Sequence, residues 1–292
     1  MKTYILFNPL AGNGKAELLC RELSASYENE VQLTAITEIT DYAAFLAPVT
    51  EQDLIVICGG DGTLNRFVNA TEGLCVKCDV AYLAAGTGND FLCDIGRESD
   101  GKPFSVKKYL QDLPVVEVKG KSYRFLNNVG FGIDGYCCEV GDQLKAKSDK
   151  PVNYTAIAIK GLLFHHKPSV ASIKVNGKAY SYKKVWLAAT MKGRYYGGGM
   201  KSAPEQDRLA EDGSVSLVVW HGTGKLRTLM RFPSIFKGEH VKYDKMIAIH
   251  KGQEIEVSFS IPTAVQIDGE TVLGVTSYRV KAGKTAPVTA PV

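Results

Sequence analysis

The hydrophobic pattern of the first 115 residues alternates short apolar runs with stretches of helical periodicity. The predicted strands are residues 3–8, 31–36, 54–58 and 80–84, and the predicted helices are residues 16–27, 41–47 and 63–70. This β-α alternation is typical of a mostly parallel sheet with helices on both faces. We therefore predict a three-layer α/β domain over residues 1–115.

From about residue 115 the pattern changes to β-rich runs separated by turn residues. The predicted strands are residues 115–118, 123–129, 173–175, 179–190, 214–220, 255–259 and 264–267. Asn176-Gly177 favours a tight hairpin, and helices are expected at 153–164 and 224–232. These features predict an antiparallel β-sandwich-like domain over 116–277, after which residues 278–292 could return to the first domain.

Composition excludes several classes of protein. With 45% hydrophobic and 23% charged residues, the chain is neither fibrous nor disordered. Its apolar runs are too short to span a bilayer, and the N-terminus lacks the apolar core of a secretory signal. The seven cysteines have no framework spacing, so we expect reduced thiols in a cytoplasmic protein. Cys75 and Cys78 have a zinc-like spacing, but no second pair accompanies them.

The net charge of +4 is unevenly distributed. Between Lys150 and Pro204 there are ten Lys or Arg residues and no Asp or Glu, whereas the remaining chain carries 25 basic and 31 acidic residues. One interpretation is a surface for an anionic partner, such as a phospholipid membrane; the other is lysines scattered over the wet face of a β-domain. No nucleic-acid-binding motif is present, so we expect no nucleic acid partner.

Three glycine-rich turns follow predicted strands. Gly59–Thr63 (GGDGT) lies between a strand and a helix, Gly86–Phe91 (GTGNDF) follows the next strand, and Asn8–Lys15 (NPLAGNGK) follows the first. Glycines let the backbone approach a ligand, and the N-terminus of a helix suits phosphate. None of the turns fits a P-loop or a dinucleotide fingerprint. Together they predict a nucleotide-binding cleft, although a tight turn capped by Asp61 is an alternative for the first.

These blocks resemble the diacylglycerol kinase catalytic family, which includes soluble bacterial lipid kinases and sphingosine kinases. The resemblance starts at the Asn8-Pro9 turn and includes GGDGTLN and GTGNDF. It continues through NNVGFGID (127–134), GGG (197–199), Ala203-Pro204, Asp212-Gly213 and Asp268-Gly269-Glu270. GGDGT alone is shared with NAD kinases and phosphofructokinase-like enzymes. The family order of the blocks, from residue 8 to 270, is more specific.

The resemblance implies an ATP site against the GGDGTLN block. The positions that match the family's nucleotide-binding residues are Asn8, Thr37, Gly59, Gly60, Asp61, Gly62, Thr63, Leu64, Asn65 and Thr87.

The resemblance also implies an acidic, water-bridged network that helps to hold Mg²⁺, formed by Asp61, Asp90 and Glu117. The family usually has Asp at the position of Glu117. Glu270 matches the general base, so Glu270 and Asp61 are the expected catalytic residues. Phosphoryl transfer needs charge neutralisation and a base for the acceptor hydroxyl, which these groups could supply. The alternative for Glu270 is a simple hairpin position, because Asp-Gly favours turns.

A second, structural Mg²⁺ is implied at Asp212, with the carbonyl groups of Leu209 and Ser214. The spacing from Pro204 to Asp212 is about two residues longer than in the family, so a solvated turn is the alternative.

The resemblance therefore implies an ATP- and Mg²⁺-dependent lipid kinase acting on diacylglycerol, the family's commonest substrate. It would be a cytoplasmic protein that associates peripherally with the anionic inner face of the membrane, and an exposed sheet edge would permit a homodimer. Two alternatives remain: an NAD kinase-like phosphotransferase, and a non-catalytic, nucleotide-regulated membrane-binding module.

Overall fold

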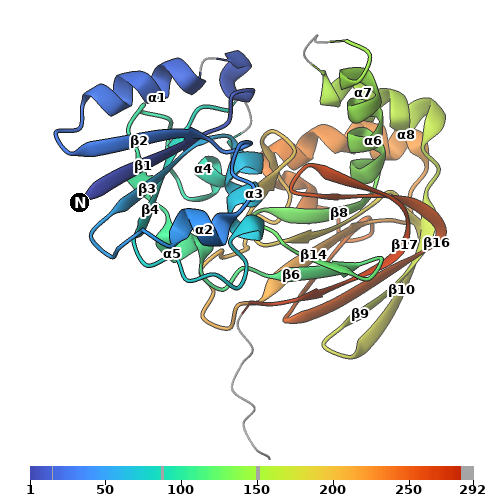
Figure 1. Cartoon of the computed structure of the whole chain (residues 1–292). Coiled ribbons are helices and arrows are strands. Elements are labelled where there is room, and N and C mark those ends of the chain that lie inside the picture. Colours follow the sequence, from blue (N-terminus) through green and yellow to red (C-terminus); the bar gives the residue numbers. More distant parts are fainter. Residues whose placement is uncertain (15, 87–88, 149–151, 284–292) are drawn as a thin grey trace, which may run out of the picture. The chain divides into compact units, whose positions relative to one another are not determined.

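In the computed structural model the chain folds as two compact units, Met1–Gln111 and the residues from Asp112 onward (Figure 1). The structure describes residues 1–14, 16–86, 89–148 and 152–283.

The first unit is built on a five-stranded sheet with the order β2-β1-β3-β4-β5. Its strands are β1 (Lys2–Phe7), β2 (Glu30–Ala35), β3 (Leu54–Gly59), β4 (Asp79–Ala84) and β5 (Phe104–Ser105). The first four strands run parallel, and β5 is antiparallel to β4. The apolar runs that predicted β1, β3 and β4 are buried, as expected when helices cover both faces, whereas β2 at the edge of the sheet is largely half-buried or exposed.

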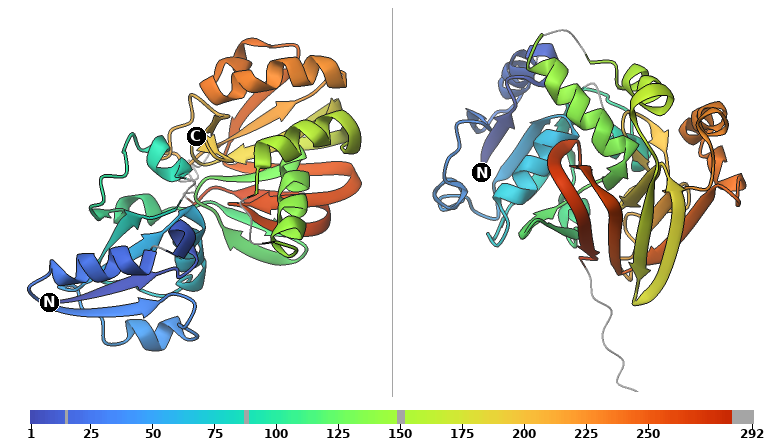
Figure 2. Two further views of the ribbon diagram at one scale, coloured as in Figure 1. Left: turned by 90° about the horizontal axis from the view of Figure 1, so that it is seen from above. Right: turned by 90° about the vertical axis from the view of Figure 1, so that its right-hand side faces the viewer.

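Helices lie on both faces of this sheet. They are a 3₁₀ turn (Ala11–Gly14), α1 (Ala16–Ala25), α2 (Tyr42–Leu46), α3 (Asp61–Ala70), α4 (Asp90–Asp94) and α5 (Lys107–Leu110). Ile5 of β1 packs in one cluster with Cys20 of α1, whereas its neighbour Tyr4 contacts Phe45 of α2. Because successive strand residues point to opposite faces, α1 and α2 cover opposite faces (Figure 2, left). The predicted three-layer α/β fold is confirmed.

The second unit is dominated by antiparallel strands. Its main sheet has the order β15-β14-β11-β8-β16-β17-β6-β7, and β9 pairs with both β16 and β10. Its strands are β6 (Val115–Val118), β7 (Lys121–Arg124), β8 (Asn128–Gly132), β9 (Ser169–Val175), β10 (Lys178–Val185), β11 (Leu187–Met191), β14 (Val215–Trp220), β15 (Ile247–Gly252), β16 (Glu254–Ile267) and β17 (Glu270–Lys281), with the small pair β12 (Tyr195–Tyr196) and β13 (Met200–Lys201). The predicted antiparallel β-rich fold is confirmed.

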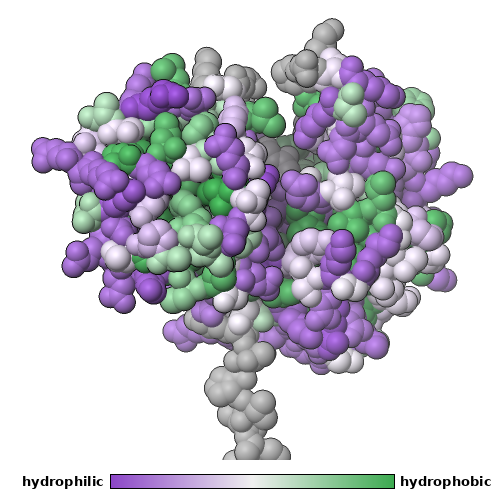
Figure 3. All heavy atoms as spheres, viewed as in Figure 1, coloured by the Kyte–Doolittle hydropathy of each residue, from purple (hydrophilic) through white to green (hydrophobic). Residues whose placement is uncertain are grey.

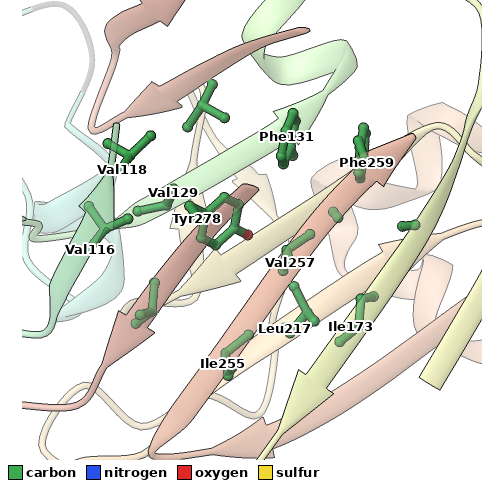
Figure 4. Packing of buried hydrophobic residues seen from close by; sticks show 14 of the residues in the cluster. Val116, Val118, Val129, Phe131, Ile173, Leu217, Ile255, Val257, Phe259 and Tyr278 are labelled. Atoms are coloured by element: carbon green, nitrogen blue, oxygen red, sulfur yellow. The ribbon is translucent and has the colours of Figure 1, made fainter. Parts of the chain in front are cut away.

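Alternating strand residues enclose the main core of this unit. The rings of Phe131 and Phe259 stack with their centroids 4.0 Å apart, and Tyr278 packs beside them (Figure 4). The hydroxyl groups of Tyr278 and Thr190 lie 2.9 Å apart within this core, so the buried phenol has a hydrogen-bond partner.

The helices of the second unit are α6 (Ile133–Lys145), α7 (Tyr154–Lys160), the π-helical turn η2 (Gly161–His165), α8 (Lys225–Arg231), and the 3₁₀ segments η3 (Phe232–Lys237) and η4 (Glu239–Lys242). α6 rests directly on β16: a Cβ at Gly135 would lie only 1.8 Å from the carbonyl oxygen of Ala264. This close contact requires glycine. The sequence pattern did not predict α6.

Two sequence expectations concern the unit boundary and the chain end. The units divide after Gln111, four residues before the expected position. Residues 278–281, expected as the start of a return to the first domain, continue β17 in the second unit, where Lys281 pairs with Val115. Residues 284–292 of that segment lie outside the described residues.

The surface is mixed in character. Figure 3 shows hydrophilic and apolar side chains intermingled on the visible face of each unit. The cations of the basic segment 150–204 are partly dispersed: Lys174 pairs with Glu256 at 3.5 Å, and Lys192 is buried. No helix among the residues that the structure describes is both long and apolar enough to cross a membrane.

Candidate active site

The carboxyl ends of the parallel strands collect several of the predicted nucleotide-binding residues. Asn8 follows β1, Thr37 lies exposed in the turn after β2, and Gly60 follows β3. Ligands of open parallel sheets bind beyond this edge. Thr87, the predicted contact after β4, lies outside the described residues.

Asp61 links two of the glycine-rich turns. It is the first residue of α3, and its Oδ2 accepts a hydrogen bond from the backbone N–H of Phe91 at 3.0 Å. Phe91 directly follows Asp90, the first residue of α4, whose side chain is buried. The GGDGT and GTGNDF turns are therefore joined through one carboxylate, and both predicted acidic residues of this unit start helices at the same sheet edge.

The GGDGT turn is tightly packed at its start and open in its middle. A Cβ at Gly59 would lie 2.3 Å from Oγ1 of Thr63, so only glycine lets α3 approach the end of β3 this closely. Thr63 Oγ1 also accepts a hydrogen bond from Nδ2 of Asn8 at 3.2 Å. Outside its own helix, a Cβ at Gly62 would meet no atom of the described residues within 4 Å, which leaves space beside the first turn of α3 as far as these residues define it.

The start of α3 has the character of an anion site. Its N-cap residue, Gly60, has no side chain that could cap the helix. The N–H group of Thr63 donates to the Gly60 carbonyl at 2.9 Å, whereas the N–H groups at the very start of a helix have no intrahelical acceptor. Such N–H groups and the positive end of the helix dipole favour phosphate. Leu64 is fully buried in the core, so its contribution to a nucleotide site is limited to its backbone. Asn65 is also buried, and its Oδ1 accepts from Asn69 Nδ2 at 3.1 Å.

Glu270 is exposed at the end of a tight hairpin in the second unit. Asp268 and Gly269 both have positive φ, of 46° and 93°, and form the two-residue connection between β16 and β17. This conformation matches a type I′ turn, for which Asp-Gly is a preferred sequence. Glu270 is the first residue after the turn and pairs with Ile267. The hairpin expectation is thus met, and the same geometry presents a carboxylate to solvent.

The side chain of Asp268 joins this hairpin to the residues at the start of β8. Its carboxylate accepts hydrogen bonds from the backbone N–H groups of Leu126, of Asn127 at 2.8 Å and of Asn128 at 2.9 Å. Burial raises the pKa of Asp268, while these three hydrogen bonds and the nearby Arg208 act in the opposite direction. Asp268 therefore fixes the position of the turn.

Arg208, in the loop 205–211, supports the two residues that directly precede β8. Its buried guanidinium donates to the carbonyl oxygen of Leu126 and, at 2.7 Å, to Oδ1 of Asn127. A buried cation needs such acceptors, because desolvation without partners is costly. The loop in which the sequence spacing departs from the family thus contributes a residue that holds the base of the hairpin.

A second buried carboxylate, Asp134, lies at the start of α6. The hydroxyl group of Tyr196 donates to both of its oxygens, at 2.9 and 3.0 Å. Burial raises the pKa of Asp134 to about 7, with the Tyr196 bond opposing this shift. A Cβ at Gly130 would lie 2.5 Å from Oδ2 of Asp134 and 2.8 Å from Nε2 of Gln266, so both side chains lie directly beside this glycine. Gln266 in turn accepts from the backbone N–H of Gly269 at 2.8 Å.

Glu117, the predicted third acidic residue, lies on β6 with its side chain away from the core residues Val116 and Val118. Its Oε1 accepts from Lys281 Nζ at 2.9 Å. This hydrogen bond lowers the pKa of Glu117, and the charges of Lys281 and Arg279 act in the same direction. Within its own unit, Glu117 is therefore a member of a surface ion-pair network on β17, and its role toward Mg²⁺ stays a prediction.

The predicted second metal site has the geometry of a compact turn. Oδ1 of Asp212 accepts from the backbone N–H of Ser214 at 3.0 Å and from its hydroxyl at 2.7 Å, and these bonds lower the pKa of Asp212. The Ser214 carbonyl accepts from Gln206 Nε2 at 3.0 Å. Leu209 has an exposed side chain. No group of three or more His, Cys, Asp and Glu side chains in the described part of the chain could hold a metal ion.

Sequence reasoning missed the supporting residues Asp134, Tyr196, Arg208 and Asp268. Asp134, Gly197–Gly199 and Asp268 belong to blocks that carried the family resemblance. The sequence blocks therefore include these residues. The local sequence, however, does not indicate that the carboxylates of Asp134 and Asp268 are buried or which residues they contact.

Comparison with known proteins identifies the family. Residues 2–113 match the model of the diacylglycerol kinase catalytic domain. Residues 127–287, more than half of the chain, match the model of the YegS C-terminal NAD kinase beta sandwich-like domain. The chain belongs to the diacylglycerol kinase catalytic domain family and is a phosphotransferase of the lipid kinase class.

Several relatives and solved structures are similar over nearly the whole chain. A protein of Bacillus subtilis (strain 168) named diacylglycerol kinase is 26% identical, with 91% of this chain and 88% of the relative covered. One from Staphylococcus aureus (strain JH9) is 25% identical over 91% and 85%. The crystal structure of a diacylglycerol kinase from Bacillus anthracis str. Sterne has a TM-score of 0.64 at 21% identity, covering 97% and 94%. Yeast NADH kinase complexed with NADH has the same fold at a TM-score of 0.51 and 12% identity, covering 99% and 80%.

Proposed function

We propose that this protein transfers the γ-phosphate of ATP, with Mg²⁺, to the hydroxyl group of a lipid, and that the lipid is diacylglycerol. The observation that carries the proposal is the junction at Asp61, whose carboxylate ties the GGDGT and GTGNDF turns together at one sheet edge. Relatives named diacylglycerol kinase, which match over most of their length, support the choice of substrate.

The first unit would bind the phosphate donor. The N-terminus of α3 and the open space at Gly62 fit the phosphate groups, and Asn8 and Thr37 lie at the same edge. Asp61 and Asp90 provide the carboxylate oxygens that Mg²⁺ prefers together with water and phosphate oxygens. Bound Mg²⁺ would neutralise the charge on the transferring phosphoryl group. Glu117 would complete the acidic set after exchanging its ion pair with Lys281.

The second unit would activate the acceptor. Glu270 is an exposed carboxylate on a turn that Asp268 holds by three backbone hydrogen bonds. A carboxylate within hydrogen-bond reach of the lipid hydroxyl can accept its proton as that oxygen attacks phosphorus. The rigid turn would limit the positions available to Glu270, which favours reaction by orientation.

Three further elements belong to the proposal. A structural Mg²⁺ at Asp212, with the carbonyl groups of Leu209 and Ser214, would require Ser214 to release the Asp212 carboxylate. Peripheral association with an anionic membrane would bring the enzyme to its substrate. A homodimer formed through an exposed strand edge is compatible with both the structural Mg²⁺ and the membrane association.

The test measures transfer of labelled γ-phosphate from ATP and Mg²⁺ to diacylglycerol in mixed micelles, with NAD as a parallel acceptor. Label in an organic-phase product that migrates as phosphatidic acid is the expected result. Label on NAD would instead assign the NAD kinase-like reaction. Saturable ATP binding with no transfer to diacylglycerol, to other bacterial lipids or to NAD would overturn catalysis in favour of a nucleotide-regulated module.

A further inference from the structure

Two helical segments of the second unit lie against each other and expose large apolar side chains. Nζ of Lys225, at the start of α8, donates to the carbonyl oxygen of Leu163 in η2 at 3.0 Å, and the two segments are in contact. Phe164 of η2 and Leu226 and Met230 of α8 are each 71% exposed. A fixed pair of segments thus presents three large apolar side chains to solvent.

The exposure follows from the two faces of α8. Thr228 and Phe232 are buried, and Leu229 packs against the core cluster around Trp220. Leu226 and Met230 are one helical turn apart on the other side, so they form a continuous apolar ridge. Single exposed apolar residues are ordinary, but clustered ones on a fixed surface mark a contact site.

The sequence stretches that carry this surface are basic and contain no acidic residue. Arg227 and Arg231 are exposed and one turn apart on α8, beside the ridge, and Lys160 lies four residues before Phe164. Arg231 is held in place by Tyr243, whose ring lies 4.7 Å from the guanidinium carbon. No Asp or Glu occurs in residues 150–204 or 213–238, the stretches that contain both segments.

We propose that Phe164, Leu226 and Met230, with Lys160, Arg227 and Arg231, form a membrane-docking patch for anionic phospholipid bilayers. In a bilayer the acyl chains lie beneath the phosphate groups. Exposed apolar side chains can therefore contact the acyl chains while the neighbouring basic side chains contact the phosphates. Anionic lipid attracts each nearby basic residue, so the two kinds of contact reinforce each other. A second copy of the chain fits less well, because an isologous contact would place the same cations opposite each other.

The docking patch confines membrane binding to one surface and does not spread it over the whole basic segment 150–204. Two cations of the basic segment 150–204, Lys174 and Lys192, are paired or buried, whereas those of the patch lie on the same segments as exposed apolar groups. The consequence for the kinase rests on the proposed function: docking would hold the enzyme at the surface where a membrane-bound diacylglycerol is found.

The experiment compares Leu226→Ser/Met230→Ser with wild type in sedimentation with vesicles of phosphatidylglycerol and phosphatidylcholine. Loss of two inserted apolar side chains should lower the partition coefficient at least about tenfold. Arg227→Ser should lower it about fivefold at 0.1 M salt and less at 0.5 M, because salt screens the charge contribution. The matched control is Leu18→Ser on α1 of the first unit, where an equally large apolar side chain is 61% exposed. It should bind as wild type.

A second readout separates this inference from the proposed function. The ratio of phosphorylation rates on diacylglycerol in vesicles and on a dissolved short-chain diacylglycerol should fall about tenfold in the double variant. Absence of transfer to both substrates in wild type would remove the kinase function but leave the vesicle result interpretable. Unchanged vesicle binding in the double variant would overturn the docking patch. A wild-type dimer that this variant dissociates, with vesicle binding unchanged, would assign the surface to a second copy.

Discussion

In the first unit the candidate groups are mainly backbone N–H groups and partly buried side chains at the ends of parallel strands. In the second unit an exposed carboxylate stands on a turn that is fixed by buried charged groups. The first arrangement presents a helix N-terminus and space to a ligand. In the second unit, Asp268 and Arg208 already form hydrogen bonds to the residues at the start of β8. Substitutions at the candidate site of the first unit should therefore affect ligand affinity. Substitutions of Asp268 or Arg208, which support the Glu270 turn, should affect both stability and turnover.

The largest effect is expected from Glu270→Gln. If Glu270 is the general base, phosphate transfer should fall about a thousandfold, because a positioned base contributes about 10²–10⁴-fold. The exposed position of Glu270 predicts little change in melting temperature. Glu239→Gln, which removes another exposed carboxylate of the second unit, is the control. A turnover rate within a few fold of wild type would remove Glu270 from the mechanism.

Asp268→Ala tests whether the turn depends on its buried carboxylate. Three backbone donors would lose their acceptor, and we expect the free energy of unfolding to fall by about 3 kcal/mol. Turnover should fall while the KM for ATP changes little, since the nucleotide groups lie in the other unit. Urea unfolding and steady-state kinetics measure the two effects. Unchanged stability would show that the hairpin is held by other contacts.

Asp134 should make stability depend on pH. Its pKa is about 7 in the folded protein, against 3.8 as the ordinary value, so the folded state holds a proton that the unfolded state has released. Stability should therefore fall as pH rises between these values, by about 1.4 kcal/mol per pH unit. Between pH 5 and 6.5 the difference between wild type and Asp134→Asn should change by about 2 kcal/mol. A constant difference across this range would contradict the buried, protonated carboxyl.

The smallest effect is expected from Asn8→Ala. Loss of the hydrogen bond to Thr63 should cost about 1 kcal/mol of stability and raise the KM for ATP a few fold. Asn29→Ala is a closely matched control, because Nδ2 of Asn29 donates to Oγ1 of Thr3 at 3.0 Å, near the opposite ends of the strands. It should lower stability similarly without affecting the KM. Equal effects of both variants on the KM would argue against an ATP site at Asn8.

The sequence predicted the first unit more completely than the second. Buried parallel strands read as continuous apolar runs, and glycine-rich turns mark their ends. In the second unit, α6 was missed because Gly135 and Gly141 lower its helix propensity; packing against β16 and Tyr154 requires both glycines. β16 was predicted as two strands around Pro262 but forms one strand with shifts in register.

The supporting groups of the candidate site could not be predicted for a different reason. Asp268 meets Leu126 and Asp134 meets Tyr196 across more than 60 residues of sequence. Their burial and their raised pKa values follow from strand pairing, which no local pattern contains. The roles of the individual site residues remain predictions.

The contact between Gly59 and Thr63 affects how such motifs should be interpreted in other genomes. Gly59 is required by the packing of α3 on β3, because a Cβ there would overlap Thr63, so a descendant that had lost catalysis would still be selected to keep this glycine. Among the described residues, Gly62 and Glu270 have no comparable packing role in their own units: a Cβ at Gly62 meets no atom within 4 Å outside its own helix, and Glu270 is exposed. Their loss or retention is therefore the better diagnostic for separating active members of the lineage from inactive ones.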